Sequence, residues 1–436
     1  MRLITHMRYL LLLMLLWAYG SIKAQNTYYP PVNQAAFWDT VSPKSLGWCT
    51  DSIAPLYQYL QNQNSKAFIV LVDGKIAMEK YFGTFTQDSF WYWASAGKSL
   101  TSLLVGKAQE DGKLKISDRS ADYLGSGWSS LTTAQEDAIT LRHHLTMTTG
   151  LDDNVPDHYC TLKSCLVYKA PPGTRWAYHN GPYTLLDRVI ENATGSTMNL
   201  YTQQTLQTKT GISGLWIKSG YNNVYFSKAR SFARFGLLAQ NGFKWNGTPI
   251  LGDTGYVRQM VNTSQNLNLS YGYLWWLNGK TSYMVPGLQN VFPGSFIPSA
   301  PKDLYSGIGK DGQFVCVSPS KKLVMVRMGN APSGQLGDVP FLLGEQMWSR
   351  LNRVMCATTG TTEVHTAPLS VWPNPAENAL FINYTGTARI SDVSGRLVKR
   401  LTIQHNQAMD ISGLKPGMYW LQTADGRVIR FMRSQD

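Results

Sequence analysis

Residues 91–98 read Trp-Tyr-Trp-Ala-Ser-Ala-Gly-Lys, and this stretch decides the interpretation of the chain. It places the hydroxyl of Ser95 and the amine of Lys98 three positions apart at the start of an apolar segment. On a helix, residues three apart lie on the same face. A buried lysine loses its proton more readily than one in water, so it can serve as the base that activates a serine nucleophile. The same spacing recurs at Ser299 and Ser318, but a proline within each of those segments disfavours a continuous helix.

The composition is that of a folded enzyme rich in aromatic residues. The chain has 436 residues, enough for two or three domains, of which 43% are hydrophobic and 15% are charged. Its 14 Trp and 23 Tyr residues can fill cores and line clefts for apolar ligands. The formal net charge is +13, but the longest basic runs are the pairs Lys321-Lys322 and Lys399-Arg400. Because the positive charges are scattered and no nucleic-acid motif accompanies them, we expect no nucleic-acid partner.

The N-terminus has the pattern of a secretory signal peptide. Arg2 and Arg8 flank its start, residues 9–18 form an apolar core, and residues 21–24 end in a small residue at the expected cut. The apolar run is shorter than the roughly 20 residues that a membrane span needs. We therefore expect residues 1–24 to be removed, and the mature chain to be secreted or on the outer cell surface without a transmembrane segment.

Five cysteines then reach an oxidising compartment, in which disulfides form. Cys160 and Cys165 are close enough in sequence to close a small loop, and they are the preferred disulfide pair. A zinc site of His158, Cys160 and Cys165 is the alternative, although it lacks a second ligand pair at standard spacing. The other three leave an odd number whose pairing the sequence does not decide: Cys49, Cys316 and Cys356.

Hydrophobic patterning predicts one α/β body. Two strands at 67–72 and 76–81 flank an Asp-Gly pair, which is a strong hairpin signal. A mainly helical region at 95–240 follows, and its last helix is expected to be capped by Ser227 and to end before Gly242. Further strands are expected at 271–277, 313–317 and 323–328, and a closing helix at 339–354. This order predicts a mixed α/β (α+β) fold, residues 25–356, with an all-helical insertion.

A change of composition follows this body. Residues 357–368 are Thr-rich, polar and without periodicity, which indicates a linker. Residues 369–436 contain alternating segments separated by Gly and Asp turns, at 380–384, 396–403 and 418–423. They predict a small β-domain that carries too little chemistry for an active site.

A second motif supports the first. Residues 172–180 read Pro-Gly-Thr-Arg-Trp-Ala-Tyr-His-Asn and precede an apolar helix expected at 183–190. Tyr178 and Asn180 are two positions apart on a turn, so both side chains can point into one cleft. The phenol can shuttle a proton if a nearby ammonium lowers its pKa, and the amide can hydrogen-bond a substrate carbonyl.

Residues 45–355 resemble the serine β-lactamase and penicillin-binding-protein superfamily, in its class C-related esterase and amidase branch. The segment at 139–151, Ile-Thr-Leu-Arg-His-His-Leu-Thr-Met-Thr-Thr-Gly-Leu, resembles the one that follows the nucleophile helix in that family. Residues 227–242 and 271–276 also match in kind and order. The resemblance implies a β-lactamase-like antiparallel sheet flanked by helices.

The same resemblance implies roles for the two motifs. Ser95 would be the acylated nucleophile, and Lys98 and Tyr178 would share proton transfer. Asn180 would hold the substrate amide.

The third family motif departs from its usual pattern. Relatives carry Lys or His, then any residue, then Gly on a strand beside the cleft, where residues 306–313 here read Ser-Gly-Ile-Gly-Lys-Asp-Gly-Gln. The preferred register puts Gly307 at the Lys or His position and Gly309 in the substrate site. The backbone N–H of Lys310 would then complete an oxyanion hole with that of Ser95. A rival register takes residues 310–312 as the motif itself.

In the preferred register, the cation that would grip a β-lactam carboxylate is missing at Gly307. This absence favours an ester or amide substrate and resembles the arrangement in amidases that cleave short nylon oligomers.

The end of the chain carries a second resemblance, to the C-terminal sorting domain of bacterial type IX secretion. It rests on four segments: Val-Trp-Pro-Asn-Pro at 371–375, Asp-Val-Ser-Gly-Arg at 392–396, Asp-Ile-Ser-Gly-Leu-Lys-Pro-Gly-Met-Tyr at 410–419, and Arg-Phe-Met-Arg at 430–433. The resemblance implies a small all-β sandwich that engages the type IX secretion machinery, with export across the outer membrane and removal of the tail on the way.

Together these features predict a secreted serine hydrolase. Ser95 would attack an ester or amide carbonyl of a small molecule or short peptide, and water would release the acid from the acyl-enzyme. No cofactor is expected, and without a His-Glu-x-x-His or comparable spacing no catalytic metal is expected either. The altered third motif motivates an alternative, a non-catalytic cell-surface protein that binds cell-wall peptide or glycan on the same fold.

Overall fold

The computed structural model describes residues 27–33, 35–332, 339–357, 369–393, 395–404, 407–424 and 426–434. The chain divides into two compact units, Met1–Ala357 and Thr358–Asp436. The expected signal peptide at 1–24 lies outside the described residues, as does the expected linker at 357–368 apart from its first residue. Among the described residues, no helix combines the length and apolar character needed to cross a bilayer.

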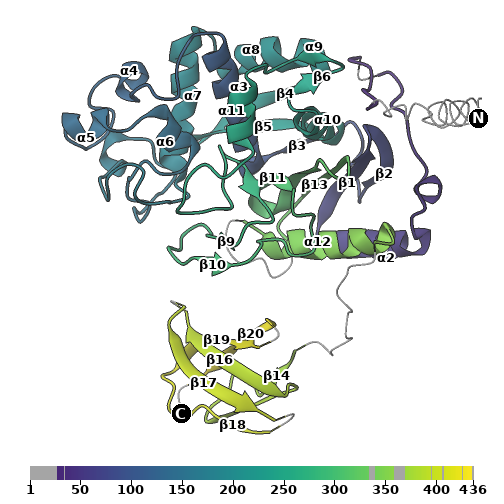
Figure 1. Ribbon diagram of the computed structural model, residues 1–436, viewed down its shortest axis with the longest axis vertical. Coiled ribbons are helices and arrows are strands. Elements are labelled where there is room, and N and C mark those ends of the chain that lie inside the picture. Colours follow the sequence, from purple (N-terminus) through teal and green to yellow (C-terminus); the bar gives the residue numbers. More distant parts are fainter. Residues whose placement is uncertain are drawn as a thin grey trace, which may run out of the picture. The chain divides into compact units, whose positions relative to one another are not determined.

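A six-stranded antiparallel sheet forms the centre of the first unit (Figure 1). Its strand order is β2–β1–β13–β12–β11–β8. The strands are β1 (Ser65–Val72), β2 (Lys75–Tyr81), β8 (Trp276–Leu277), β11 (Tyr305–Gly309), β12 (Gln313–Ser318) and β13 (Leu323–Gly329). The hairpin expected around the Asp-Gly pair is confirmed, because β1 pairs with β2 across Asp73 and Gly74. Strands β12 and β13 are buried throughout, so the sheet is covered on both faces.

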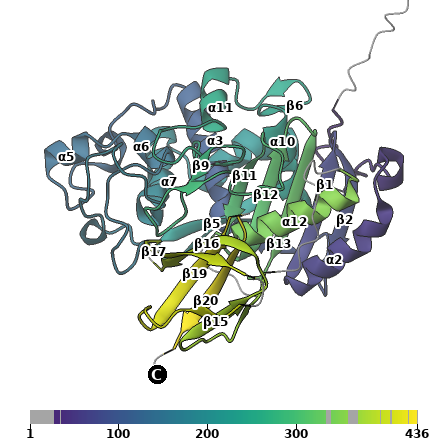
Figure 2. The same cartoon turned by 60° about the horizontal axis from the view of Figure 1, so that its bottom comes forward.

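Helices cover the two faces of this sheet. Gly236 of α10 (Ala229–Gln240) approaches Val315, whereas Gly344 of α12 (Phe341–Val354) approaches the neighbouring residue Phe314. Since successive strand residues point to opposite faces, α10 and α12 lie on opposite sides of the sheet. Helix α2 (Ile53–Asn62) packs beside α12, and Figure 2 shows α12 in front of the row of strands. This arrangement confirms the expected antiparallel sheet flanked by helices.

A helical region extends from the side of the sheet that bears α10 (Figure 1). Its helices are α3 (Gly97–Glu110), α4 (Ala121–Leu124), α5 (Thr133–Asp137), α6 (Leu141–Leu145), α7 (Asn180–Thr194), α8 (Met198–Thr202), α9 (Thr208–Thr210) and α11 (Thr254–Met260). The expected all-helical insertion also contains a hairpin of β4 (Gly214–Ser219) and β5 (Asn222–Lys228), which pairs with β3 (Phe90–Tyr92). Gly220 makes its turn with φ +58°. Two short hairpins complete the unit, β6 (Lys244–Trp245) with β7 (Thr248–Pro249) and β9 (Ser282–Tyr283) with β10 (Phe292–Pro293).

Two local predictions were wrong. Ser227 does not cap α10, because it lies in β5, where its hydroxyl accepts a hydrogen bond from the Trp93 indole at 2.8 Å. The strand expected at 271–277 is reduced to Trp276–Leu277, because Leu274 has φ +60° and its N–H bonds the Leu145 carbonyl instead of a strand. In both cases a contact distant in sequence overrides the local pattern.

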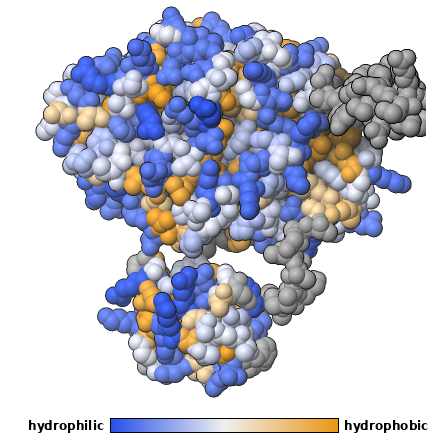
Figure 3. Space-filling view, viewed as in Figure 1, coloured by the Kyte–Doolittle hydropathy of each residue, from blue (hydrophilic) through white to orange (hydrophobic). Residues whose placement is uncertain are grey.

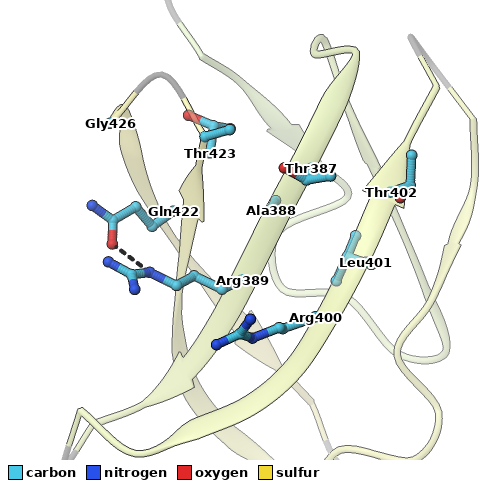
Figure 4. A pocket seen from close by; sticks show the side chains of 10 residues that line it. Thr387, Ala388, Arg389, Arg400, Leu401, Thr402, Gln422, Thr423 and Gly426 are labelled. Carbon is cyan, nitrogen blue, oxygen red and sulfur yellow. Dashed lines mark hydrogen bonds between the residues drawn. The ribbon is translucent and has the colours of Figure 1, made fainter.

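The second unit is the small all-β sandwich that was expected. One sheet contains β16 (Gly386–Asp392), β17 (Leu397–Ile403), β19 (Gly417–Thr423) and β20 (Val428–Arg433). The other contains β14 (Val371–Trp372), β15 (Ala379–Ile382) and β18 (Met409–Asp410). Ile390, Leu421 and Phe431 are fully buried in its core. On the outer face of the larger sheet, Arg389 and Arg400 lie on neighbouring strands, and Arg389 donates to Gln422 at 2.8 Å (Figure 4).

The visible surface of the chain is mainly polar, with apolar residues in small separate areas (Figure 3). The first unit has one large buried core and the second has its own smaller one. Each unit therefore has the apolar interior that an independently folding domain needs.

Candidate active site

Ser95 lies on a short 3₁₀ turn, η3 (Ala94–Ala96), between β3 and α3. Ala94 has φ +46°, and this left-handed residue turns the chain sharply from strand to helix. Trp93, the residue before this turn, anchors it. Its side chain is fully buried, and its backbone N–H donates to the Tyr225 carbonyl at 2.8 Å. Ser95 itself is partly exposed.

Lys98, in the first turn of α3, connects the two sequence motifs. Its side chain is buried, with an exposed fraction of 3%. The Nζ atom donates to Ser95 Oγ at 3.0 Å and to Asn180 Oδ1 at 2.7 Å. The structure therefore brings Ser95, Lys98 and Asn180 into direct contact, although 82 positions separate the last two in sequence.

Tyr178 completes the group. The Lys98 Nζ atom lies 4.9 Å from the centre of the Tyr178 ring. That ring is buried and stacks on Trp276, with ring centres 5.8 Å apart. The ring of the Tyr-x-Asn segment thus packs against the amine, and the sharing of a proton by phenol, amine and hydroxyl stays a prediction.

Two residues of α7 that the sequence analysis did not single out also interact with the amine, one by contact and one through its charge. Tyr183 of α7 lies below Lys98, with Nζ 4.2 Å from its ring centre, so the amine sits between two aromatic faces that attract its charged form. One turn further along α7, Asp187 is buried, and burial raises its pKa to about 8. The charge of Lys98 and a hydrogen bond with Asn223 oppose this rise. The sequence could have indicated both residues, because positions 180, 183 and 187 have the spacing of residues on one face of a helix.

Strand β11 brings the third motif against the serine turn. A Cβ at Gly309 would lie 2.4 Å from the Trp93 carbonyl oxygen and 3.0 Å from the Ala96 nitrogen, so only glycine fits there. A Cβ at Gly307 would lie 3.0 Å from Ser99 Oγ. Lys310 begins the turn η6 (Lys310–Gly312), which joins β11 to β12. Gly307 and Gly309 lie on β11, whereas residues 310–312, which form the rival register, lie in the turn beyond it.

A disulfide loop lies against the start of α7. Cys160 and Cys165, the preferred pair, are joined by a disulfide. The Gly181 N–H donates to the His158 carbonyl at 2.8 Å, one residue after Asn180. The zinc alternative is wrong in this structure, because a disulfide leaves neither sulfur as a thiolate ligand. The remaining cysteines form the disulfide Cys49–Cys356 and leave Cys316 buried and unpaired.

Comparison with protein-family models gives two matches. Residues 59–339 match the Beta-lactamase family. The chain belongs to this family. Residues 370–430 match the Secretion system C-terminal sorting domain. The two matched segments fall in the two structural units, and the family is one of serine hydrolases.

A curated relative of the family is a beta-lactamase of Escherichia coli (strain K12), which is 30% identical over 131 residues. This match covers 28% of the chain and spans only a third, 33%, of that relative.

Solved structures share the β-lactamase fold at low sequence identity. A Bacillus anthracis protein provisionally named a 6-aminohexanoate-dimer hydrolase has a TM-score of 0.55 at 18% identity, covering 77% of this chain and 92% of its own. A family VIII carboxylesterase has a TM-score of 0.54 at 13% identity, with coverages of 73% and 99%. A penicillin-binding-protein homologue from Caulobacter crescentus has a TM-score of 0.53 at 14% identity, with coverages of 71% and 98%.

Proposed function

We propose that the chain is a secreted serine hydrolase that cleaves an ester or amide bond through an acyl-enzyme on Ser95. One observation carries the proposal: Lys98 Nζ lies within hydrogen-bond distance of both Ser95 Oγ and Asn180 Oδ1, at 3.0 and 2.7 Å. Nucleophilic catalysis by serine needs such a base beside the hydroxyl, held in place by a third group, and Asn180 can orient the Lys98 amine in this way.

The reaction runs in two halves. In acylation, the Lys98/Tyr178 pair takes the proton from Ser95, and Oγ attacks the substrate carbonyl carbon. The tetrahedral oxyanion is stabilised by the backbone N–H groups of Ser95 and Lys310, and the proton passes to the leaving alcohol or amine. In deacylation, water gives a proton to the same pair, its oxygen attacks the acyl carbon, and Ser95 recovers its hydrogen as the acid departs.

The third motif bears on the substrate. At Gly307 the chain has no side chain that could contact a substrate carboxylate, and a Cβ there would lie 3.0 Å from Ser99 Oγ. A neutral ester or amide needs no cation at this position. The carboxylate of a β-lactam would find no cationic side chain at Gly307 with which to pair. The names of two proteins with this fold, the 6-aminohexanoate-dimer hydrolase and the carboxylesterase, support the same substrate class.

The sorting domain sets where the reaction takes place. Its match at 370–430 implies interaction with the type IX secretion machinery and export to the cell surface or beyond. We propose that the signal peptide at 1–24 starts this route, and that substrates are therefore met outside the cell.

The test is a turnover assay of the purified chain on three substrates: a chromogenic ester, a D-amino-acid amide and a cephalosporin. We expect hydrolysis of the ester or the amide, and a loss of at least roughly 10³-fold in Ser95→Ala. Ser102→Ala is the matched control, because Ser102 is a buried serine of α3 whose hydroxyl has no hydrogen-bond partner in the described part of the chain. Turnover by Ser95→Ala equal to that of the wild-type chain contradicts the proposal. Binding of a cell-wall peptide measured by calorimetry, together with no turnover of any of the three substrates, supports the alternative of a binding protein.

A further inference from the structure

A buried arginine holds the turn that follows Lys310. Arg327 of β13 has no exposed surface. Its Nη1 donates to the carbonyl oxygens of Asp311 and Gly312 at 2.9 and 2.6 Å, and its Nη2 donates to the Gln63 carbonyl at 2.5 Å. Burial lowers the pKa of Arg327 to about 9. Its planar fork of donors fixes several carbonyl groups at once in a rigid geometry that the single ammonium of a lysine lacks.

The turn needs this support because its backbone is strained. Asp311 has φ +62° and Gly312 has φ +79°, so two successive residues are left-handed. This conformation costs a residue other than glycine roughly 1 kcal/mol. A Cβ at Gly312 would lie 2.3 Å from Arg327 Nη1, so the guanidinium occupies the space beside the glycine.

A hydrogen bond joins this turn to the serine segment. The Tyr92 hydroxyl donates to Asp311 Oδ2 at 2.6 Å. Tyr92 is three residues before Ser95, and Asp311 directly follows Lys310. Burial, followed by the contact with Asp311, raises the pKa of Tyr92, so the phenol remains a donor at neutral pH. The bond therefore connects the two segments whose N–H groups form the proposed oxyanion hole.

We propose that Tyr92, Asp311 and Arg327 are positioning residues that set the spacing between the oxyanion donors at Ser95 and Lys310. The inference rests on the proposed hydrolase function. Such donors stabilise a transition state only when they are held in advance about 3 Å from the developing oxyanion. Arg327 fixes the shape of the Lys310 turn, and the Tyr92–Asp311 bond fixes its distance from the serine turn.

The test compares Tyr92→Phe and Asp311→Asn with the wild-type chain. Tyr92→Phe removes the hydrogen bond between the two side chains, and Asp311→Asn weakens it. Because asparagine tolerates the left-handed backbone, Asp311→Asn still tests the proposal if Tyr92→Phe fails to fold. We expect kcat to fall roughly 10- to 100-fold with KM changed less than about twofold. The affinity of a boronate, which forms a tetrahedral adduct on the serine, should fall by the same factor as kcat.

Tyr123→Phe is the matched control, because the Tyr123 hydroxyl also donates to a carboxylate, Asp118, at 2.7 Å. Tyr123 lies away from the proposed site, since its backbone carbonyl accepts a hydrogen bond from Asn192, near the end of α7 that is remote from Asn180. We therefore expect Tyr123→Phe to keep full activity. Unchanged kcat and boronate affinity in both test variants overturn the positioning role alone. Failure of the wild-type chain to form any adduct on Ser95 overturns the hydrolase function and this proposal with it.

Discussion

Lys98 contacts Ser95, Asn180 and two aromatic rings, so its removal should affect every step of proton transfer. We predict that Lys98→Met lowers the acylation rate roughly 10²- to 10⁴-fold, the usual contribution of a positioned base. Lys107→Met is the control on the same helix, because the Lys107 amine pairs with Glu110 and Asp111 away from the site. Single-turnover kinetics with a chromogenic ester measure the effect, and a rate within tenfold of wild type would remove Lys98 from the mechanism.

Asp187 gives the site a pH-dependent stability. Its folded pKa, about 8, is above the ordinary value of 3.8 for an aspartate, so the folded chain binds a proton that the unfolded chain releases. Its contribution to stability is fully present below the unfolded pKa and is lost as pH rises towards 8. Asp187→Asn should therefore flatten the fall in Tm between about pH 4 and pH 8. Thermal unfolding of the wild-type chain and the variant across this pH range measures the effect, and Asp51→Asn, at an exposed position, is the control. An unchanged dependence of Tm on pH in Asp187→Asn would contradict the prediction.

At the scale of elements, the site depends on the close approach of β11 to the serine turn. We predict that Gly309→Ala, whose Cβ would lie 2.4 Å from the Trp93 carbonyl oxygen, destabilises the chain by about 1–3 kcal/mol and lowers kcat at least tenfold. Gly97→Ala is the control on the other side of the turn, where a Cβ would meet its nearest atom at 3.7 Å. Urea unfolding and turnover of both variants give the comparison, and equal tolerance of the two would contradict the packing argument.

The sequence predicted correctly those elements that are specified by residues close together in the chain. The β1–β2 hairpin follows from its Asp-Gly turn, and α7 follows from apolar spacing after the Tyr-x-Asn segment. The contact of Ser95 with Lys98 was predictable because both lie within one helical turn. Strand β5, in contrast, includes Ser227 because it pairs with β3, more than 130 positions earlier.

The parts that could not be predicted are held by long-range contacts. The bond from Tyr92 to Asp311 joins residues 219 positions apart, and no local pattern marks either as a partner. The meeting of Lys98 with Asn180 was inferred from family resemblance, since spacing alone places neither motif relative to the other. Composition and periodicity identify faces of elements, but the fold decides which faces meet.

For the whole molecule, the proposed chemistry and the match to the sorting domain lie in separate units. Every residue of the proposed site lies in the first unit, which has its own core. We predict that a chain ending at Ala357 keeps kcat and KM within about twofold of the full chain, because it retains every residue of the proposed site and the core of the first unit. In a bacterium with type IX secretion it should accumulate inside the cell, whereas the full chain is found outside. Turnover assays on cell and medium fractions check both parts, and normal export of the shortened chain would contradict the assignment of the tail.

The central claim is that the partly exposed hydroxyl of Ser95 is the nucleophile. The most direct measurement is peptide mapping by mass spectrometry after the purified full chain reacts with an activity-based phosphonate. We predict one adduct, on Ser95, which is absent from Ser95→Ala and forms much more slowly in Lys98→Met. A chain that stays unlabelled, or that carries the adduct on another residue, would contradict it.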